Sequence, residues 1–183
     1  MQLRAAAAAL LAEQGFGALT HRALAARSGV PVASTTHYFR GVDDLVLAAA
    51  DELAEQRLAR ARAVVAGLPR RRTSAAAAAR VVARVVLGEE PSPAELSATA
   101  ERYLQAGRVP QLRPLVAAWN AELRGLVAQA LDACGRPVTP ARAHVLVAAL
   151  DGLVLAALAE GADDPVGAVV RPLARLLADP AVA

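Results

Sequence analysis

The chain has 183 residues, a formal net charge of +3, and 56% hydrophobic residues of which few are aromatic. This length suits one large helical domain, or a small domain followed by a larger one. We expect an all-α fold, because no run alternates apolar and polar residues with β-branched side chains on one face, which excludes a sheet protein.

Glycine, proline and capping residues divide the chain into about nine predicted helices. The first covers residues 2–14 and stops at Gly15, and Thr20 is the N-cap of a second over residues 21–28. A third runs from Pro31 to about Tyr38. The later helices are predicted over residues 42–65, 75–87, 93–107, 112–133, 140–161 and 165–177. The helix over residues 93–107 begins with a capping box at Ser92–Glu95.

The stretch over residues 20–45 has the spacing of two short helices joined by a tight turn. Ala25 is small enough to let the helices cross closely, and Gly29 suits the left-handed end of the first helix. Val30 and the Thr35 methyl group would fill the space between them. The pattern is that of a helix-turn-helix, whose second helix enters the DNA major groove; an ordinary helical hairpin with a solvated polar face is the alternative.

The residues that follow favour the DNA-binding interpretation. Tyr38-Phe39, followed by Arg40-Gly41-Val42-Asp43-Asp44-Leu45, resembles the end of the recognition helix and the start of the fourth helix in TetR-type transcriptional regulators. The resemblance covers about the first 50 residues and implies a helix-turn-helix head over residues 1–46, with Phe39 as a core anchor. Hydroxyls and an imidazole suit phosphate oxygens and base edges. Carried over from the family motif, Ser34, Thr36 and Tyr38 resemble the phosphate and base contacts. The full set of DNA contacts that we predict is Thr20, Arg22, Val32, Ala33, Ser34, Thr36, His37 and Tyr38.

Two positions depart from the family pattern. Thr35 stands where an aliphatic residue is usual, so we expect a more lightly packed hairpin. Val42 stands where a lysine often meets a phosphate, and only its backbone N–H at a helix N-terminus could replace that contact. Charge favours the head as the DNA-binding part, since residues 1–40 carry four arginines against Glu13 alone, a net +3, whereas residues 41–68 carry a net −2.

The second domain, over residues 47–183, resembles the family only in length and helical character. The resemblance implies a small-molecule pocket there, for a mostly apolar effector because the helices carry few charges. The candidate lining residues are Tyr103, Gln105, Trp119, Asn120, Glu122, His144 and Asp151. Tyr103 and Trp119 could instead be core residues whose polar atoms are satisfied locally. Asp151 lies in an apolar stretch, so it should pair with an arginine or face a pocket.

The helix predicted over residues 140–161 is apolar almost all round, and one subunit cannot bury all of it. We therefore expect one face in the core and another in a homodimer interface, with the last helix supplying a partner. The interface residues predicted are Leu146, Leu150, Leu153, Val154, Leu158 and Leu173.

Other chemistry is scarce in this sequence. The three histidines lie far apart and Cys134 is the only cysteine, so we expect no metal site, no disulfide, no cofactor and no enzyme activity. Arg70, Arg71 and Arg72 form either a phosphate patch or a solvated loop. The apolar run over residues 145–159 is too short to span a bilayer comfortably, so we expect no membrane partner. The single cysteine, Cys134, is typical of a reducing compartment, so we expect a cytoplasmic protein.

The sequence is therefore interpreted as a ligand-responsive repressor. As a homodimer it would bind double-stranded palindromic operator DNA and be released by its effector. The competing class is an all-helical interaction protein without a DNA role, and an acidic surface around residues 32–38 would favour that class.

Overall fold

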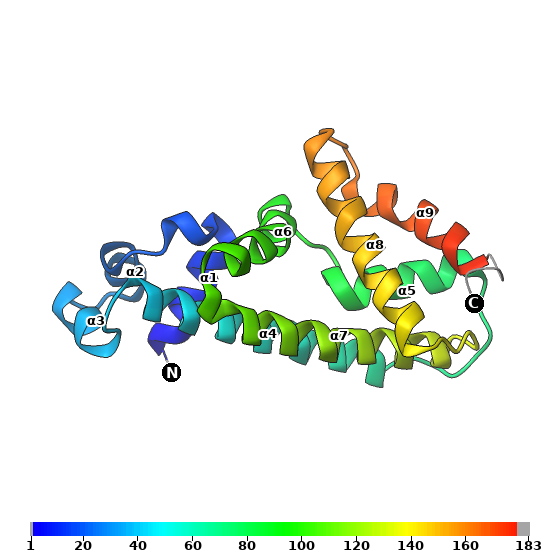
Figure 1. The fold of residues 1–183 in the computed structure, drawn as a ribbon, viewed down its shortest axis with the longest axis horizontal. Helices are drawn as coiled ribbons and strands as arrows, with labels where there is room; N and C mark the ends of the chain where they lie inside the picture. Colours follow the sequence, from blue (N-terminus) through cyan, green and yellow to red (C-terminus); the bar gives the residue numbers. More distant parts are fainter. Residues whose placement is uncertain (1, 179–183) are drawn as a thin grey trace. The chain divides into compact units, whose positions relative to one another are not determined.

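The computed structural model describes residues 2–178, and these form nine α-helices, two short 3-10 helices and no strand (Figure 1). The elements are α1 (Gln2–Gln14), η1 (Phe16–Ala18), α2 (His21–Ser28), α3 (Val32–Tyr38), α4 (Val42–Ala66), α5 (Ala75–Leu87), α6 (Pro93–Arg108), η2 (Pro110–Leu112), α7 (Arg113–Ala133), α8 (Pro140–Ala159) and α9 (Pro165–Ala178). The predicted all-α fold is confirmed, and each predicted helix end lies within two residues of the observed one.

Local capping explains why the helices begin where they do. The Thr20 hydroxyl accepts a hydrogen bond from the Ala23 amide at 3.1 Å, and Ser92 and Glu95 form the predicted capping box ahead of α6. Pro31 is the N-cap of α3 rather than its first helical residue. The side-chain caps at Thr20 and Ser92 satisfy amides that would otherwise lack a partner, and each contributes about 0.5–2 kcal/mol.

The chain packs as two compact units, and the boundary differs from the one expected at residue 46. The first unit contains residues 2–57 and 92–117, and the second contains residues 58–91 and 118–178 of the described chain. The N-terminal part of α4, all of α6 and the start of α7 therefore pack with the head. The sequence could not show this, because α6 follows the head by more than 30 residues.

The core of the first unit joins the head to α4 and α6. Leu11, Leu24 and Leu45 are fully or almost fully buried there, beside Phe39 and Ala106. An ion pair between Arg4 of α1 and Asp51 of α4 closes one side of this core. The apolar positions recur at helical spacing, which is why α1, α2 and α4 each bury one face.

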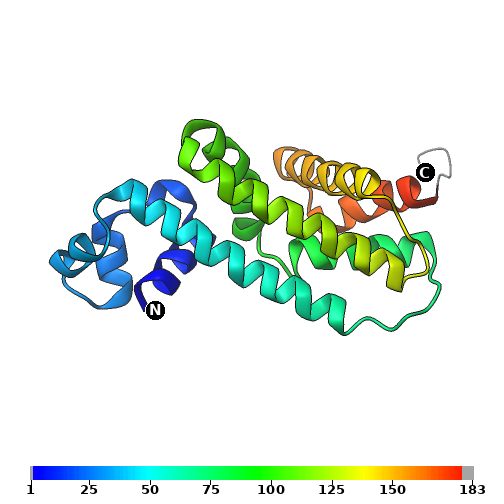
Figure 2. The same ribbon diagram turned by 60° about the horizontal axis from the view of Figure 1, so that its bottom comes forward.

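The second unit is built on α5, α7, α8 and α9, with α9 packed against both α5 and α8 (Figure 2). Val82, Leu131 and Leu173 are buried in its interior. At one end of the unit, Arg136 donates to the Leu177 carbonyl and Arg142 to the Leu176 carbonyl, at 3.1 and 2.9 Å. These two guanidinium groups satisfy the otherwise unpaired carbonyls at the C-terminal end of α9.

Candidate nucleic-acid interface and the apolar face of the second unit

The hairpin of α2 and α3 has the geometry of a helix-turn-helix (Figure 1). Gly29 ends α2 with φ of 71°, in the left-handed region, and Ala25 is buried at the crossing, as predicted. Thr35 and Phe39, four residues apart on the inner side of α3, are 0% and 2% exposed. Val30, which was expected in the core, is only half-buried.

The buried Thr35 hydroxyl has hydrogen-bond partners on both sides of the hairpin. It donates to the Val32 carbonyl at 2.7 Å, and its oxygen lies 3.2 Å from His21 Nδ1 at the start of α2. A threonine in place of the family's usual aliphatic residue is tolerated here because its polar atom is satisfied.

The outer face of α3 presents every predicted recognition-helix contact to solvent. Val32, Ala33, Ser34, Thr36, His37 and Tyr38 are all exposed, and so are Thr20 and Arg22 at the start of α2. The Tyr38 ring is 52% exposed and packs edge-on against the buried Phe39, with centroids 4.8 Å apart. The buried ring thus orients the exposed one, and the Tyr38 hydroxyl remains available as donor or acceptor.

Ion pairing divides the arginines of the head into two groups. Arg4 is paired with Asp51, and Arg27 donates two hydrogen bonds to Glu13, at 2.7 and 2.6 Å, which lower the pKa of the Glu13 carboxyl. Arg22 and Arg40 are exposed and have no acidic partner among residues 2–178. Only these two guanidinium groups add uncompensated positive charge near α3.

Arg40 is the residue that the sequence assignment omitted. It occupies the turn between α3 and α4, where its amide donates to Asp44 at 3.1 Å and fixes the turn. Its position directly after α3, in the turn before α4, was the signal in the sequence that could have identified it. Val42 follows it, exposed at the N-terminus of α4, where backbone N–H groups favour an anion.

The predicted ligand-binding residues are divided between the two units. In the first unit, Tyr103 is partly exposed on α6, its hydroxyl accepts from Arg102 at 2.9 Å, and Gln105 lies half-buried on the same helix. In the second unit, Trp119 is buried on α7, where Glu122 forms an ion pair with Arg62. Asn120 and Asp151 are half-buried, whereas His144 is exposed at the surface of α8.

The structure corrects which face of α8 is outward. Leu146, Leu150, Val154 and Leu173 are at most 2% exposed within a single chain, so their side chains retain almost no surface for contact with a partner. Leu153 and Leu158 are half-buried. The outward face instead contains the exposed residues Val145, Ala148, Gly152, Leu155, Ala156 and Ala159. Periodicity could not distinguish the two faces, because both are apolar.

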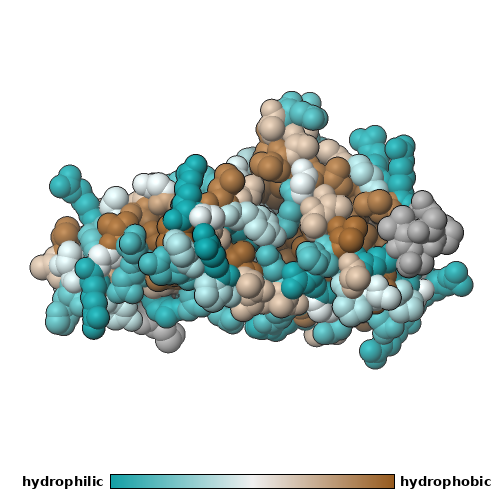
Figure 3. All heavy atoms as spheres, viewed as in Figure 1, coloured by the Kyte–Doolittle hydropathy of each residue, from teal (hydrophilic) through white to brown (hydrophobic). Residues whose placement is uncertain are grey.

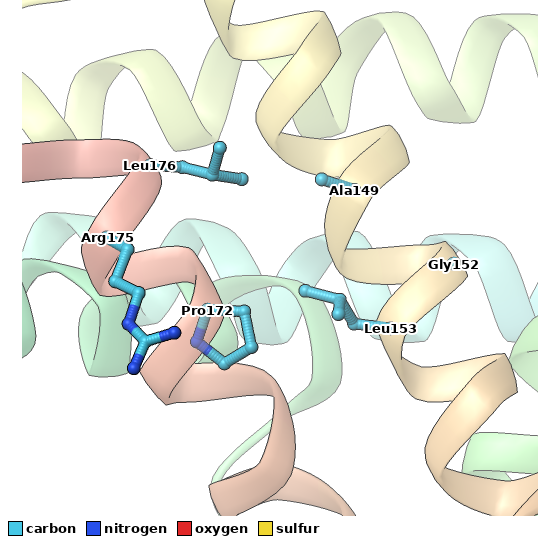
Figure 4. Close-up of a pocket in the computed structure, with 6 residues that line it drawn as sticks. All are labelled: Ala149, Gly152, Leu153, Pro172, Arg175 and Leu176. Carbon is cyan, nitrogen blue, oxygen red and sulfur yellow. The ribbon is translucent and has the colours of Figure 1, made fainter. Parts of the chain in front are cut away.

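This α8 outward face continues into a shallow groove between α8 and α9 (Figure 4). Figure 3 shows apolar side chains gathered over α8 and α9. The groove has a volume of about 550 Å³, and Ala149, Gly152 and Leu153 of α8 oppose Pro172 and Leu176 of α9 across it. Apolar side chains surround it, and Arg175 lies at its edge.

By length and composition alone, α8 could cross a membrane, and it is the one helix in residues 2–178 for which this holds. It is 20 residues long, longer than the apolar run on which the sequence argument relied. A core or interface helix of a soluble protein has the same properties, and α8 packs against α9 along one side. The composition of α8 is therefore weak support for a membrane span.

Comparisons with known proteins cover both parts of the chain. The family described as "Bacterial regulatory proteins, tetR family" matches residues 3–56, and "Tetracyclin repressor-like, C-terminal domain" matches residues 73–180. No curated protein matches the chain.

Several solved structures share the fold over nearly the whole chain. The multidrug binding protein EbrR complexed with proflavin is 31% identical, with 96% of this chain and 97% of that chain covered and a TM-score of 0.68. SCO1917 from Streptomyces coelicolor A3, a member of the TetR family, is 30% identical, with 96% and 95% covered and a TM-score of 0.64. SCO7518 from Streptomyces coelicolor A3(2) is 27% identical, with 97% of each chain covered and a TM-score of 0.69. Other EbrR structures hold ethidium and malachite green.

Proposed function

The chain belongs to the tetR family of bacterial regulatory proteins, and from that premise we propose that it is a repressor that binds a palindromic operator as a homodimer. Family membership makes it a transcriptional regulator with a helix-turn-helix DNA-binding domain, and not an enzyme. We propose in addition that the protein represses transcription, dimerises, binds an operator and is released from it by an effector in the cytoplasm.

The observation that carries operator binding is the outward face of α3. Ser34, His37 and Tyr38 are exposed there, and so is Thr36, whose hydroxyl donates to the Ala33 carbonyl at 3.0 Å and can still accept a hydrogen bond. Thr35 and Phe39 are buried on the opposite side. Ser34, Thr36 and Tyr38 supply hydrogen-bonding groups for base edges and phosphates. Arg22 and Arg40 add the positive charge that attracts the DNA backbone.

The proposed dimer uses the outward face of α8 together with the groove beside α9. Val145 and Leu155 are 51% and 54% exposed in one chain, which is costly for large apolar side chains in water. On the same face, Ala148, Gly152 and Ala156 are small enough for a second helix to approach closely. Two copies of α8 and α9 facing each other would form a four-helix interface that covers this face.

A dimer is also what the reading head requires. One head contacts only half of a palindromic site, and a dimer places two recognition helices about one helical turn, or a small multiple of it, apart. Changes in dimer geometry would therefore change the match to the operator.

We place the effector in the second domain and expect it to be mostly apolar. EbrR, at 30–32% identity, is titled a multidrug binding protein and has been solved with proflavin, ethidium and malachite green, so these aromatic compounds are the first to test. Trp119 and Tyr103 are the only aromatic residues outside the head. The effector would favour a dimer geometry whose recognition helices no longer fit the half-sites, with α4 carrying the change because it supplies residues to both units.

Selection from a random duplex library tests operator binding. We expect the full-length protein to enrich an inverted repeat, and the binding constant for that repeat to fall steeply with salt. Enrichment of no inverted repeat would contradict the proposal.

Effector release is tested on the selected operator. Trp119, the single tryptophan, reports binding of each compound through its fluorescence, and polarisation of a labelled operator reports release of DNA. A compound that binds tightly while operator affinity stays unchanged would refute coupling for that compound.

A further inference from the structure

Glu101 of α6 reaches the turn between α1 and α2, although 85 residues separate it from its partner in that turn. The Phe16 amide donates to Glu101 Oε2 at 3.2 Å. Phe16 is the first residue of η1, and no side chain of the turn itself caps that amide. The Glu101 carboxylate therefore acts as the cap of η1.

Gly15 shows how closely the carboxylate approaches the backbone. Its φ of 77° and ψ of −179° lie in a region that essentially only glycine occupies. A Cβ added at Gly15 would lie 2.8 Å from Glu101 Oε2, closer than real Cβ atoms approach another atom. Gly15 is required both by its own conformation and by the position of Glu101.

The turn leads directly into the DNA-contacting end of α2. After η1, Leu19 is buried in the core of the first unit and Thr20 begins α2 as its N-cap. On the other side, α6 packs against α1 and buries Ala106 in that same core. Glu101 thus links a helix anchored in the core to the residues just before Thr20.

We propose that Glu101 is a positioning residue for operator binding, acting through Gly15 and Phe16 on the N-terminal end of α2. It touches no DNA itself. Without its carboxylate, the turn samples several conformations, and only the fraction with Thr20 and Arg22 correctly placed binds the operator with full affinity. Apparent affinity falls in proportion to that fraction. This inference rests on the proposed function.

The first test compares Glu101→Ala, Glu101→Gln and Glu89→Ala in the full chain, on the operator that the wild type selects. Binding is measured well below the melting temperature of every variant, so that all are folded. We expect about a tenfold loss of affinity for Glu101→Ala, from loss of a hydrogen bond to a charged group. Glu101→Gln keeps an acceptor and should remain within about threefold of wild type. Glu89, an exposed glutamate of the second unit, is the charge-matched control and should change nothing.

A second measurement needs no DNA and so separates this inference from the proposed function. Amide hydrogen exchange over residues 16–24 should be about tenfold faster in Glu101→Ala than in wild type, and close to wild type in Glu101→Gln. Unchanged exchange would overturn the positioning role whether or not an operator exists. Faster exchange with unchanged operator affinity would overturn the link to DNA binding, whereas a wild type without any operator would refute the proposed function instead.

A double-mutant cycle checks the contact itself. Gly15→Ala should be strongly destabilising, and part of that effect comes from the carboxylate of Glu101. The double variant Gly15→Ala/Glu101→Ala should therefore lose less unfolding free energy than the sum of the losses in the two single variants. Strict additivity would show that the two residues do not interact and would overturn the proposal.

Discussion

Replacing Leu155 with arginine should dissociate the proposed dimer without unfolding the protomer. Leu155 is 54% exposed on the outward face of α8, so its replacement disturbs little of the core of its own subunit. Complete burial of a leucine contributes about 1.5–3 kcal/mol, so burying the exposed half contributes about 0.8–1.5 kcal/mol per subunit. A symmetric interface counts this contribution twice, about 1.5–3 kcal/mol in all.

That loss alone weakens the dimer by about 10- to 100-fold, since 1.4 kcal/mol corresponds to a factor of ten. The substitution also brings a guanidinium group from each subunit into an apolar interface, which adds a desolvation and repulsion cost. Operator affinity should fall as the dimer is lost, because a single protomer contacts only half of the palindrome. This loss is expected although the helix-turn-helix head over residues 1–46 is unchanged.

Leu104→Arg is the matched control. Leu104 is 62% exposed on α6, so the same substitution at similar exposure should leave both dimerisation and operator binding intact. Sedimentation or light scattering over a concentration series gives the dimer dissociation constant, and circular dichroism confirms folding. If the folded Leu155→Arg protein dissociates at the same concentration as wild type, the interface lies elsewhere; a wild type that is monomeric at micromolar concentration would refute the dimer itself.

Three further substitutions test the core, the reading face and the ion pairs of the head. Leu150→Ala should cost about 2–5 kcal/mol of unfolding free energy, because Leu150 is 0% exposed within one chain; a loss of dimerisation with unchanged stability would contradict its burial. Tyr38→Ala should weaken operator binding more than Tyr38→Phe while the melting temperature stays near wild type, and equal affinities for wild type and both variants would exclude Tyr38 from the interface. Glu13→Gln should lower the melting temperature at neutral pH by removing the pair with Arg27. Because the folded-state pKa of Glu13 lies below its ordinary 4.5, the stabilisation is present above pH 4.5 and is lost as the pH falls through the lowered pKa, so the two melting temperatures should converge in acid. A difference that grows in acid would refute this assignment.

The helices, their ends and the exposed face of α3 could all be predicted from the sequence. These depend on residues close together in the chain: Thr20 caps α2, Gly29 ends it, and Thr35 and Phe39 lie on one side of α3 because they are four apart. When a short helix has polar residues on one side and apolar residues on the other, the periodicity of the sequence predicts which side is buried. The family resemblance rested on the same local pattern.

Features that arise from contacts between distant residues could not be predicted from the sequence. In α8 the apolar residues surround the helix, so only its packing against α9 shows that Leu150 is inward and Leu155 outward. The contact of Glu101 with the Phe16 amide joins segments 85 residues apart, and neither residue carries a signal of it in the sequence. The pairing of Arg27 with Glu13 likewise depends on how the helices are placed, because opposite charges interact through space and not along the chain. Among the arginines of the head, it leaves Arg22 and Arg40 as the two without an acidic partner in the described residues.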